Sequence, residues 1–411
     1  MNHRLATMCG RDPEEVGRAS SPLELLFDLT FVVAFSVAGS EFAHMISQGH
    51  WELGLVGFGF ACFSIIWAWI NFSWFASAYD TDDWLYRVTT MVQMVGVVIL
   101  ALGLPAMFAS LDPSRGGGHF ENKVMVLGYV VMRIAMVFQW VRAWVQDPGR
   151  RKACQTYIVT ILIAQVGWTV LAFTHLTLLP TLLLGVVLMC IELAGPVIAE
   201  SHGQGTPWHA HHIVERYQLM AIITLGEGVV GTVGTLSAAV QEHGWTTEAV
   251  LVVIAGIGLT FAMWWVYFAA AMPQVLHHNR SRSFGFGYFH IVTFASIAAT
   301  GAGLHVAGLV LENEATISTS WAVASVSIPV GVYLLSIFVL WFYMVRQWDA
   351  LHTLMLGGAA VFLVAATWMA SAGVVMGWCL LVVMLAPVAI VVGYETRGHR
   401  HLAENFERLA V

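Results

Sequence analysis

Charged residues are scarce in this sequence. Lys, Arg, Asp and Glu make up 10% of the 411 residues, whereas soluble domains carry about 25%. Hydrophobic residues make up 58% of the chain, and the mean hydropathy is +0.74. This number of charged residues is too small to cover the surface of a soluble domain. The composition therefore predicts an all-α polytopic membrane protein.

Other features that the sequence lacks exclude some classes of function. The net charge of −7 is spread over the loops and leaves no basic patch for nucleic acid. The five cysteines have no CxxC or CxH spacing, which indicates neither a zinc site nor a disulfide framework, and we expect no cofactor. Residues 1–20 are polar, and we expect the apolar run that follows them to act as an uncleaved anchor.

Twelve runs of residues meet the requirement of about 20 mainly apolar residues for a membrane-spanning helix. They are 23–47, 54–78, 88–110, 124–145, 156–174, 177–199, 213–239, 249–271, 285–310, 321–345, 351–371 and 374–394. The last two are separated by so short a link that we expect a tight hairpin.

Positive charges predict the orientation. If the N-terminus is cytoplasmic, the external loops hold only Arg115 and Lys123, and Arg133 lies deep in a span. The other 15 of the 18 Lys and Arg residues then fall at the cytoplasmic side. We therefore expect both termini in the cytoplasm.

Twelve spans also divide into two groups of six. The scheme is an N-terminal segment 1–20, a first half 21–199, a His-rich linker 200–212, a second half 213–394 and a tail 395–411. Glu24 and Glu215 each begin the first span of a half, which favours parallel repeats. Their residue-level similarity is faint, and chance likeness between two membrane helices is the alternative.

Two carboxylates stand out in the first span. Glu24 and Asp28 are four residues apart, so they lie on one face of a helix. A charge in hydrocarbon costs roughly 2.5–3.5 kcal/mol on insertion scales. Both carboxylates can be ionised there only if the rest of the chain supplies a cation or water.

Further polar residues fall at the same depth of the predicted bundle, toward its cytoplasmic side. They are Asn71, Asp80, Gln93, Gln139, Arg142, Glu192, Glu215, Arg216 and His290. In one interpretation this layer is a structural network in which Arg142, Arg216 and Arg87 neutralise Glu24, Asp28 and Asp80. In the other it is a vestibule that binds a cation, a proton or a polar solute.

Arg133 and Glu227 lie deeper, well inside their spans and at similar depths. A salt bridge between them is the simplest way to keep both charged. If they do not meet, we expect Glu227 to be protonated and suited to a proton relay. The glycines around Glu227 fit GxGxxG, but inside a span they predict close helix contact or a helix break rather than a dinucleotide site.

Histidines precede the seventh span. His209, His211 and His212 with Glu215 form the pattern HxHHxxE, in which two ligands at helical spacing could hold zinc. The alternative interpretation is a solvated, His-rich helix cap at the membrane interface.

Several of these motifs together resemble the bacterial low temperature requirement protein A family, over residues 20–395. The resemblance rests on residues 21–35, Asp80–Asp83 with Arg87, residues 129–133, His212-x-x-Glu215-Arg216 and Leu225-Gly226-Glu227. It implies an integral inner-membrane protein of bacteria, in a family named for a growth defect in the cold, and no established reaction. The family pattern includes Glu24, Asp28, Arg133, Glu215, Arg216 and Glu227.

The function hypotheses come from different classes. The first is a transporter or channel for a cation, proton or small polar solute, with Glu24 and Asp28 lining a cytoplasm-open cavity and Arg133 and Glu227 at its gate. The second is an intramembrane metal-dependent enzyme at His209, His211, His212 and Glu215, and the third is a scaffold that supports growth in the cold. The expected partners are the lipid bilayer and an unidentified solute or ion, and a homo-oligomer is left open.

Overall fold

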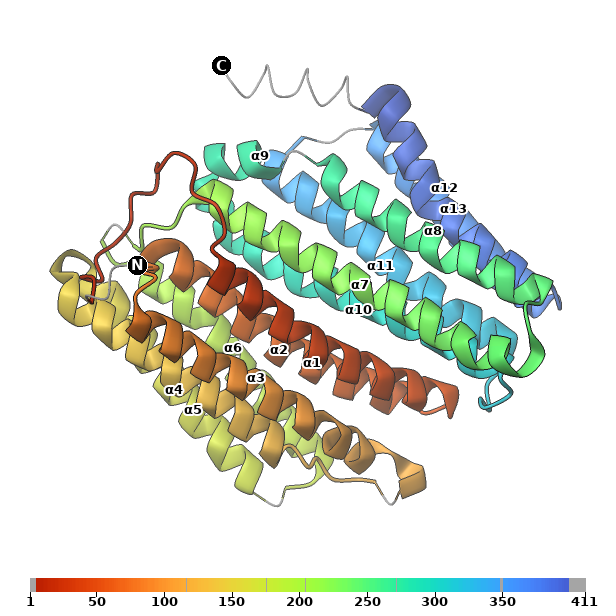
Figure 1. Cartoon of the computed structure of the whole chain (residues 1–411), viewed down its shortest axis with the longest axis horizontal. Helices are drawn as coiled ribbons and strands as arrows, with labels where there is room; N and C mark the ends of the chain where they lie inside the picture. The colour runs from red at the N-terminus through yellow and green to blue at the C-terminus, as the bar shows by residue number, and fades with distance from the viewer. Residues whose placement is uncertain are drawn as a thin grey trace. The chain divides into compact units, whose positions relative to one another are not determined.

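A computed structural model describes residues 5–115, 117–174, 176–203, 205–270, 272–347 and 350–398, without the side chains of 235–239 and 241–243. Residues 1–4 and 399–411, which belong to the predicted terminal segments, lie outside the described residues, as does residue 204 of the predicted linker. Every regular element in the described ranges is helical (Figure 1).

The chain divides into two compact units. Unit 1 comprises the residues up to Glu41 and Glu52–Leu219, and unit 2 comprises Phe42–Trp51 and the residues from Met220 onward. The elements up to the end of α6 are α1 (Pro22–Ser47), α2 (Trp51–Tyr79), α3 (Trp84–Leu111), η1 (Pro113–Arg115), α4 (Lys123–Gln146), η2 (Pro148–Arg150), α5 (Arg151–Phe173) and α6 (Leu178–Glu200). They are followed by α7 (Ala210–His243), α8 (Thr247–Ala269), α9 (Met272–His278), η3 (Arg280–Arg282), α10 (Ser283–Leu311), α11 (Thr319–Val345), α12 (Ala350–Ser371), α13 (Met376–Gly393) and η4 (Tyr394–Gly398).

Twelve helical segments of the described chain are long and apolar enough to cross a membrane. The prediction of an all-α protein with about twelve spans is therefore confirmed. One detail was not predicted, the short helix α9 that follows α8. Of the two alternatives for the glycines near Glu227, the helix break is not observed, because α7 continues through Glu227. The division into two six-helix repeats with a linker at 200–212 stays a prediction.

Acidic residues set the start of α3. Asp83 is its N-cap, and the Asp83 Oδ1 atom accepts a hydrogen bond of 2.9 Å from the backbone N–H of Tyr86. A side-chain oxygen at this position satisfies one of the backbone donors that the first helical turn leaves without a partner. Asp83, the last residue of the acidic run after α2, thus caps the start of the next span.

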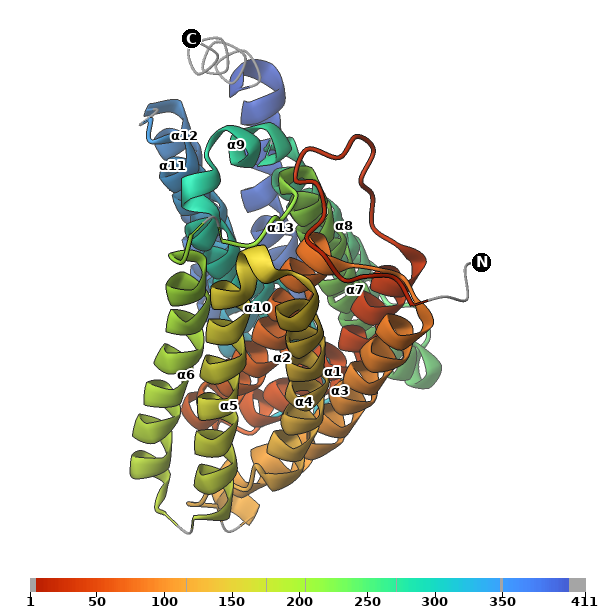
Figure 2. The ribbon, with the colours of Figure 1, turned by 90° about the vertical axis from the view of Figure 1, so that its left-hand side faces the viewer.

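In unit 1, α3, α4, α5 and α6 form successive contacts in chain order, and Figure 2 shows α4, α5 and α6 side by side. Glycine brings α3 and α4 into close contact. A Cβ atom on Gly128 would lie 2.3 Å from the backbone nitrogen of Leu100, and one on Gly103 would lie 2.3 Å from that of Met125. Small residues let the two helix backbones pack closely. Such packing matters in a membrane, because apolar side chains gain little free energy when they move from lipid to a helix interface.

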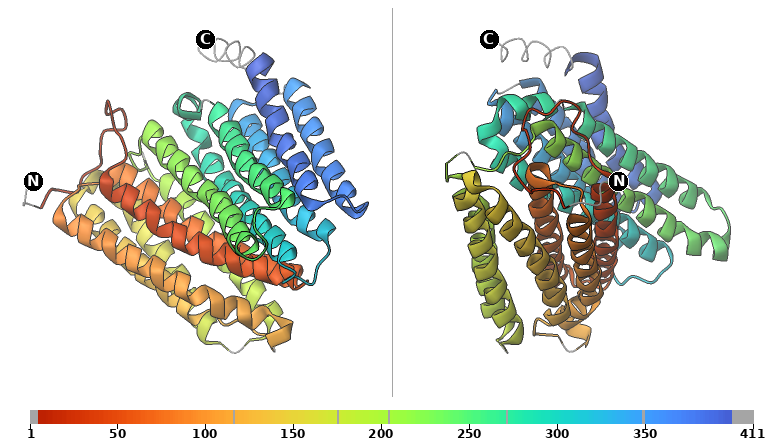
Figure 3. Two further views of the ribbon diagram at one scale, coloured as in Figure 1. Left: turned by 45° about the vertical axis from the view of Figure 1, so that its right-hand side comes forward. Right: turned by 60° about the vertical axis from the view of Figure 1, so that its left-hand side comes forward.

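In unit 2, α10 contacts α11, α8 contacts α13, and α12 forms with α13 the hairpin at the blue end of the chain (Figure 3). The turn of that hairpin contains Gly373 at φ +85°, a backbone conformation that glycine adopts without strain. The predicted tight link between the last two spans is therefore present. Gly231 also lies directly against the backbone carbonyl of Gly301, which joins α7 to α10 as expected from the small residues near Glu227.

The close contact between α3 and α4 predicts the effect of a single methyl group. We expect Gly128→Ala to destabilise the protein by about 1–3 kcal/mol through overpacking, despite the better helix propensity of alanine. Gly59→Ala is the matched control, because a Cβ atom at Gly59 in α2 has no atom within 4 Å. Thermal unfolding in detergent measures both, and an unchanged unfolding temperature for Gly128→Ala would show that α3 and α4 separate freely.

Candidate functional site

The carboxylates of Glu24 and Asp28 on α1 share one arginine from α7. The Nη1 atom of Arg216 lies 2.9 Å from Glu24 Oε1, and its Nη2 atom lies 2.5 Å from Asp28 Oδ1. None of the three side chains is exposed. One interpretation of the sequence counts Arg216 among three arginines that neutralise Glu24, Asp28 and Asp80, and in unit 1 Arg216 alone binds both Glu24 and Asp28. The one-turn spacing of these acids lets a single guanidinium reach both.

Neutral donors complete this cluster. The Trp69 indole N–H donates to Asp28 Oδ1 at 2.7 Å, and His212 Nε2 lies 3.1 Å from Glu24 Oε1. The backbone N–H of Ser21 donates to Glu24 Oε2 at 2.7 Å. We call Glu24, Asp28, Arg216, Trp69 and His212 the acid–arginine cluster.

The N-terminal segment 5–20, the red trace in Figure 2, contains no helix but is tied to the same end of unit 1. The backbone N–H groups of Ala6, Met8 and Gly10 donate to Asp83, Gln146 and Asp147, at 3.2, 2.6 and 3.2 Å. Met8 is completely buried. The segment is thus held mainly through backbone hydrogen bonds to the side chains of the bundle.

The same segment brings positive charge to the cluster. Arg18 Nη2 lies 3.5 Å from Asp80 Oδ2 and 3.9 Å from Glu24 Oε1. Arg11 lies 3.9 Å from Asp80 but is engaged more closely by Glu15, at 2.7 Å. Three buried carboxylates, counting Asp80, therefore face the two buried guanidinium groups of Arg216 and Arg18.

Asp80 lies in the loop between α2 and α3, and its pKa is raised. Burial and the negative charge of Glu24 raise the pKa of Asp80 to about 6, against the opposing effect of Arg18 and Arg11. Asp83 behaves in the opposite way: although burial acts against it, its hydrogen bonds from Arg142 and the backbone of Tyr86 lower its pKa. One of the two neighbouring acids is thus set to titrate near neutral pH.

A second buried site surrounds Glu192 on α6. Five side chains donate to its carboxylate: Trp67 (2.6 Å), Arg133 (2.8 Å), Tyr129 (3.0 Å), Trp168 (3.2 Å) and Gln165 (3.3 Å). Arg133 also donates to the Tyr129 hydroxyl at 2.5 Å. This arrangement links α2, α4, α5 and α6 through one carboxylate.

Helix α2 connects the two sites. Trp67 and Trp69 are two residues apart, so their side chains leave α2 on nearly opposite faces. Trp67 reaches Glu192, whereas Trp69 reaches Asp28. In agreement with this position, α2 is the most buried of the twelve candidate spans.

The family model described as bacterial low temperature requirement A protein (LtrA) matches residues 19–387, a range that contains both buried sites. The chain belongs to this family. No curated protein and no solved structure matches it. The resemblance seen in the sequence is thereby confirmed, and the twelve apolar helices make this LtrA-family chain a multi-pass membrane protein.

The structure corrects the expected partners of three arginines. Arg133 is paired with Glu192 instead of Glu227. Arg142 binds Asp83 and the carbonyl of Ala6, and Arg87 binds Asp82 at 2.6 Å, so neither serves the cluster. The reason is that each arginine has a nearer acid on a neighbouring helix or loop. The acid expected from depth in the membrane alone is not the nearest one.

The other predicted site residues occupy separate positions. In unit 1, Gln93 donates to Gln139 at 2.9 Å, Asn71 donates to the carbonyl of Trp67 at 2.8 Å, and Glu215 accepts from Ser20 at 3.2 Å. In unit 2, His290 lies 2.9 Å from the Tyr267 hydroxyl, and Glu227 lies on α7 where that helix contacts Gly301. The layer inferred from the sequence is thus several local networks.

The histidines around the start of α7 are not brought together as a metal site in the described part of the chain. Among the described residues, no group of three His, Cys, Asp or Glu side chains is placed to hold a metal ion. His209 accepts from the backbone of His212 and contacts the carbonyl of Glu15, His212 faces Glu24, and His211 is exposed. Burial lowers the pKa of His209.

Sequence reasoning missed most of the neutral partners. Trp69, Tyr129, Gln165 and Trp168 all hydrogen-bond a buried carboxylate. The signal was partly visible, because polar-tipped aromatic residues inside spans need hydrogen-bond partners when buried. Arg18 carried no signal, since it precedes the first span in a segment without regular structure.

Asp80 predicts a dependence of stability on pH. Its pKa is about 6 in the folded protein and near 3.8 otherwise, so between these values the folded state binds more protons than the unfolded state. We therefore expect stability to fall as the pH rises from about 4 to 6, by at most about 3 kcal/mol. Asp80→Asn should flatten this part of the curve of unfolding temperature against pH in detergent.

The control for that measurement is Glu52→Gln, which changes an exposed carboxylate in the first turn of α2. Its curve should follow that of the unmodified protein. If Asp80→Asn also follows it, Asp80 does not titrate in this range.

The Glu192 site predicts a large loss of stability when its charge is removed. Glu192→Gln keeps the shape of the side chain but leaves Arg133 buried without its counter-charge, which costs about 3–5 kcal/mol. Glu121→Gln, which removes the exposed partner of Lys123, should change stability by less than about 1 kcal/mol. Equal unfolding temperatures for the two variants would mean that Arg133 has another counter-charge.

Proposed function

We propose that this LtrA-family protein conducts protons or a small cation across the bacterial plasma membrane, with the acid–arginine cluster as its ion site. The observation that carries the proposal is the charge of this site. Glu24, Asp28 and Asp80 are buried in unit 1 with Arg216 and Arg18, so three acids face two arginines. A proton or a cation would balance the remaining negative charge.

Buried polar atoms around the cluster support an exchangeable ligand. Among the described residues, the Tyr86 hydroxyl, His212 Nδ1 and Arg18 Nε are buried and have no hydrogen-bond partner. The charges of Asp80 and Glu24 both act on Tyr86, which supports including its hydroxyl in the proposed site. Because buried polar groups are destabilising unless they are hydrogen-bonded, water or a hydrated ion suits this position.

The N-terminal segment provides a means of access. It contributes Arg18 to the site and is attached largely by single hydrogen bonds from its backbone. Displacement of the segment would remove one positive charge from the acids and open the end of unit 1. The site would then attract a cation more strongly, which couples opening to binding.

The orientation belongs to the same proposal. With both termini in the cytoplasm, 15 of the 18 Lys and Arg residues lie on the cytoplasmic side, with Arg115 and Lys123 outside. The acid–arginine cluster, near the beginning of α1, would then open toward the cytoplasm. Glu227 of unit 2 remains the proposed proton site deeper in the membrane.

A second candidate function is a non-transporting scaffold that supports growth in the cold. The observation that favours it is the Glu192 site, where five side chains hold one carboxylate and join four helices. A network of this kind fixes how helices are paired without requiring any ion to pass.

Flux through proteoliposomes distinguishes the two functions. We expect purified protein to increase proton or rubidium uptake into vesicles under an imposed membrane potential, compared with protein-free vesicles. Asp28→Asn and Asp80→Asn should reduce this uptake at least about tenfold, because each removes the surplus charge that attracts the cation. Glu227→Gln tests the proposed proton site in the same assay.

Glu52→Gln is again the control with an exposed carboxylate, and its uptake should equal that of the unmodified protein. Asp80 lies at the edge of the site, so Asp80→Asn keeps the test informative if Asp28→Asn does not fold. Uptake equal to that of empty vesicles, or unchanged in both folded variants, would reject transport in favour of the scaffold.

A further inference from the structure

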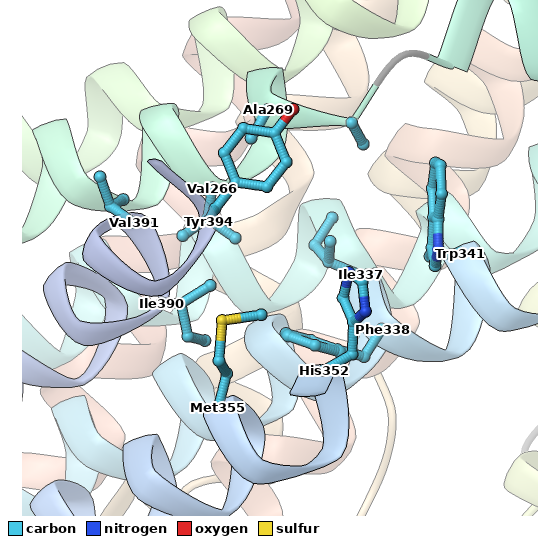
Figure 4. A pocket seen from close by; sticks show the side chains of 11 residues that line it. Val266, Ala269, Ile337, Phe338, Trp341, His352, Met355, Ile390, Val391 and Tyr394 are labelled. Carbon is cyan, nitrogen blue, oxygen red and sulfur yellow. The ribbon is translucent and has the colours of Figure 1, made fainter. Parts of the chain in front are cut away.

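Unit 2 contains an apolar hollow at one end of its bundle. Figure 4 shows it between α8, α11, α12 and the end of α13, lined by Val266, Ile337, Phe338, Met355 and Ile390 among others. A second hollow adjoins it and shares Phe338, Trp341 and His352. The lining of both hollows is mostly apolar, which suits an alkyl chain better than a polar solute.

Amphipathic rings mark one end of this hollow. Trp341 and Tyr394 lie on two sides of it in Figure 4, and the His352 ring contacts Phe338 at 5.8 Å between centroids. These residues lie near the end of α11, the end of α13 and the start of α12. Trp and Tyr favour the level of the lipid headgroups, so this end of the hollow is placed at a membrane interface.

Arginines gather at the same end. Arg346 caps α11 and is exposed, Arg397 follows Tyr394 by one helical turn and is exposed, and Arg282 donates to the carbonyl of Met344 in the last turn of α11. Glu395 is the acid among them, and it accepts a hydrogen bond from Trp265 at 3.0 Å. Among the residues that the structure describes at this end of unit 2, these three arginines thus outnumber the acid Glu395.

We propose that this hollow binds an anionic phospholipid. One acyl chain lies between α11, α12 and α13, and the phosphate lies at the mouth near Arg282, Arg346 and Arg397. The apolar lining corresponds to the acyl tail, the Trp and Tyr rings to the interface, and the arginines to the phosphate headgroup. The three groups of residues follow one another in the same order as these parts of the lipid. Basic sites between helices select anionic headgroups, because each arginine near the phosphate adds attraction. The proposal is independent of ion conduction, since it concerns residues of unit 2 only.

Photo-crosslinking tests the site in the purified, full-length protein. The probes are phosphatidylglycerol and phosphatidylcholine that carry the same photoreactive acyl chain. We expect phosphatidylglycerol to label Met355 and Val391 preferentially, and the double variant Arg346→Gln/Arg397→Gln to reduce this preference by about fivefold for each arginine. Ala269→Trp, which fills the hollow, should reduce labelling by both lipids.

Two matched variants control for general effects. Arg151→Gln removes an exposed arginine of unit 1, and Ala360→Trp adds the same ring to an exposed position of α12. Neither should change the labelling of Met355 and Val391. Equal labelling by the two lipids, or labelling confined to exposed residues such as Val361 and Val364, would overturn the proposal and indicate only the surrounding lipid.

Discussion

The salt bridge between Arg216 and the pair Glu24–Asp28 is the interaction on which unit 1 depends. All three groups are fully buried, so none can be solvated by bulk water. Each charge is tolerable only because the others are within hydrogen-bond distance. This requirement fixes the register of α1 against the first half of α7, because sliding either helix by a turn would separate the charges.

The two tryptophans of α2 extend that constraint through unit 1. Trp69 binds Asp28 on one face, and Trp67 binds Glu192 on the other. Arg133 and Tyr129 then attach α4 to the same carboxylate. Polar contacts therefore specify which helices are neighbours, a task that apolar side chains perform poorly in a membrane, where lipid competes for the same contacts.

The balance of charge differs between the Glu192 site and the acid–arginine cluster, and this difference affects their possible functions. Around Glu192, one carboxylate faces one guanidinium and several neutral donors, so the site is balanced. Around Glu24 and Asp28, Asp80 adds a further acid, and part of the compensation comes from Arg18 on a segment without helix. A site whose counter-charge is attached this way can respond to protons or ions, which is why we place the proposed function there.

The sequence by itself determined the twelve helical spans, because length and hydropathy decide which segments can leave water. It also determined that Glu24 and Asp28 share one face of the first span, since they are four residues apart, and that Arg216 lies at a similar depth. Only the tertiary structure decided that Arg133 binds Glu192 and that Arg18 reaches Asp80. The physical reason is that a position in a span specifies depth and face, whereas the identity of the neighbouring helix depends on how all helices assemble.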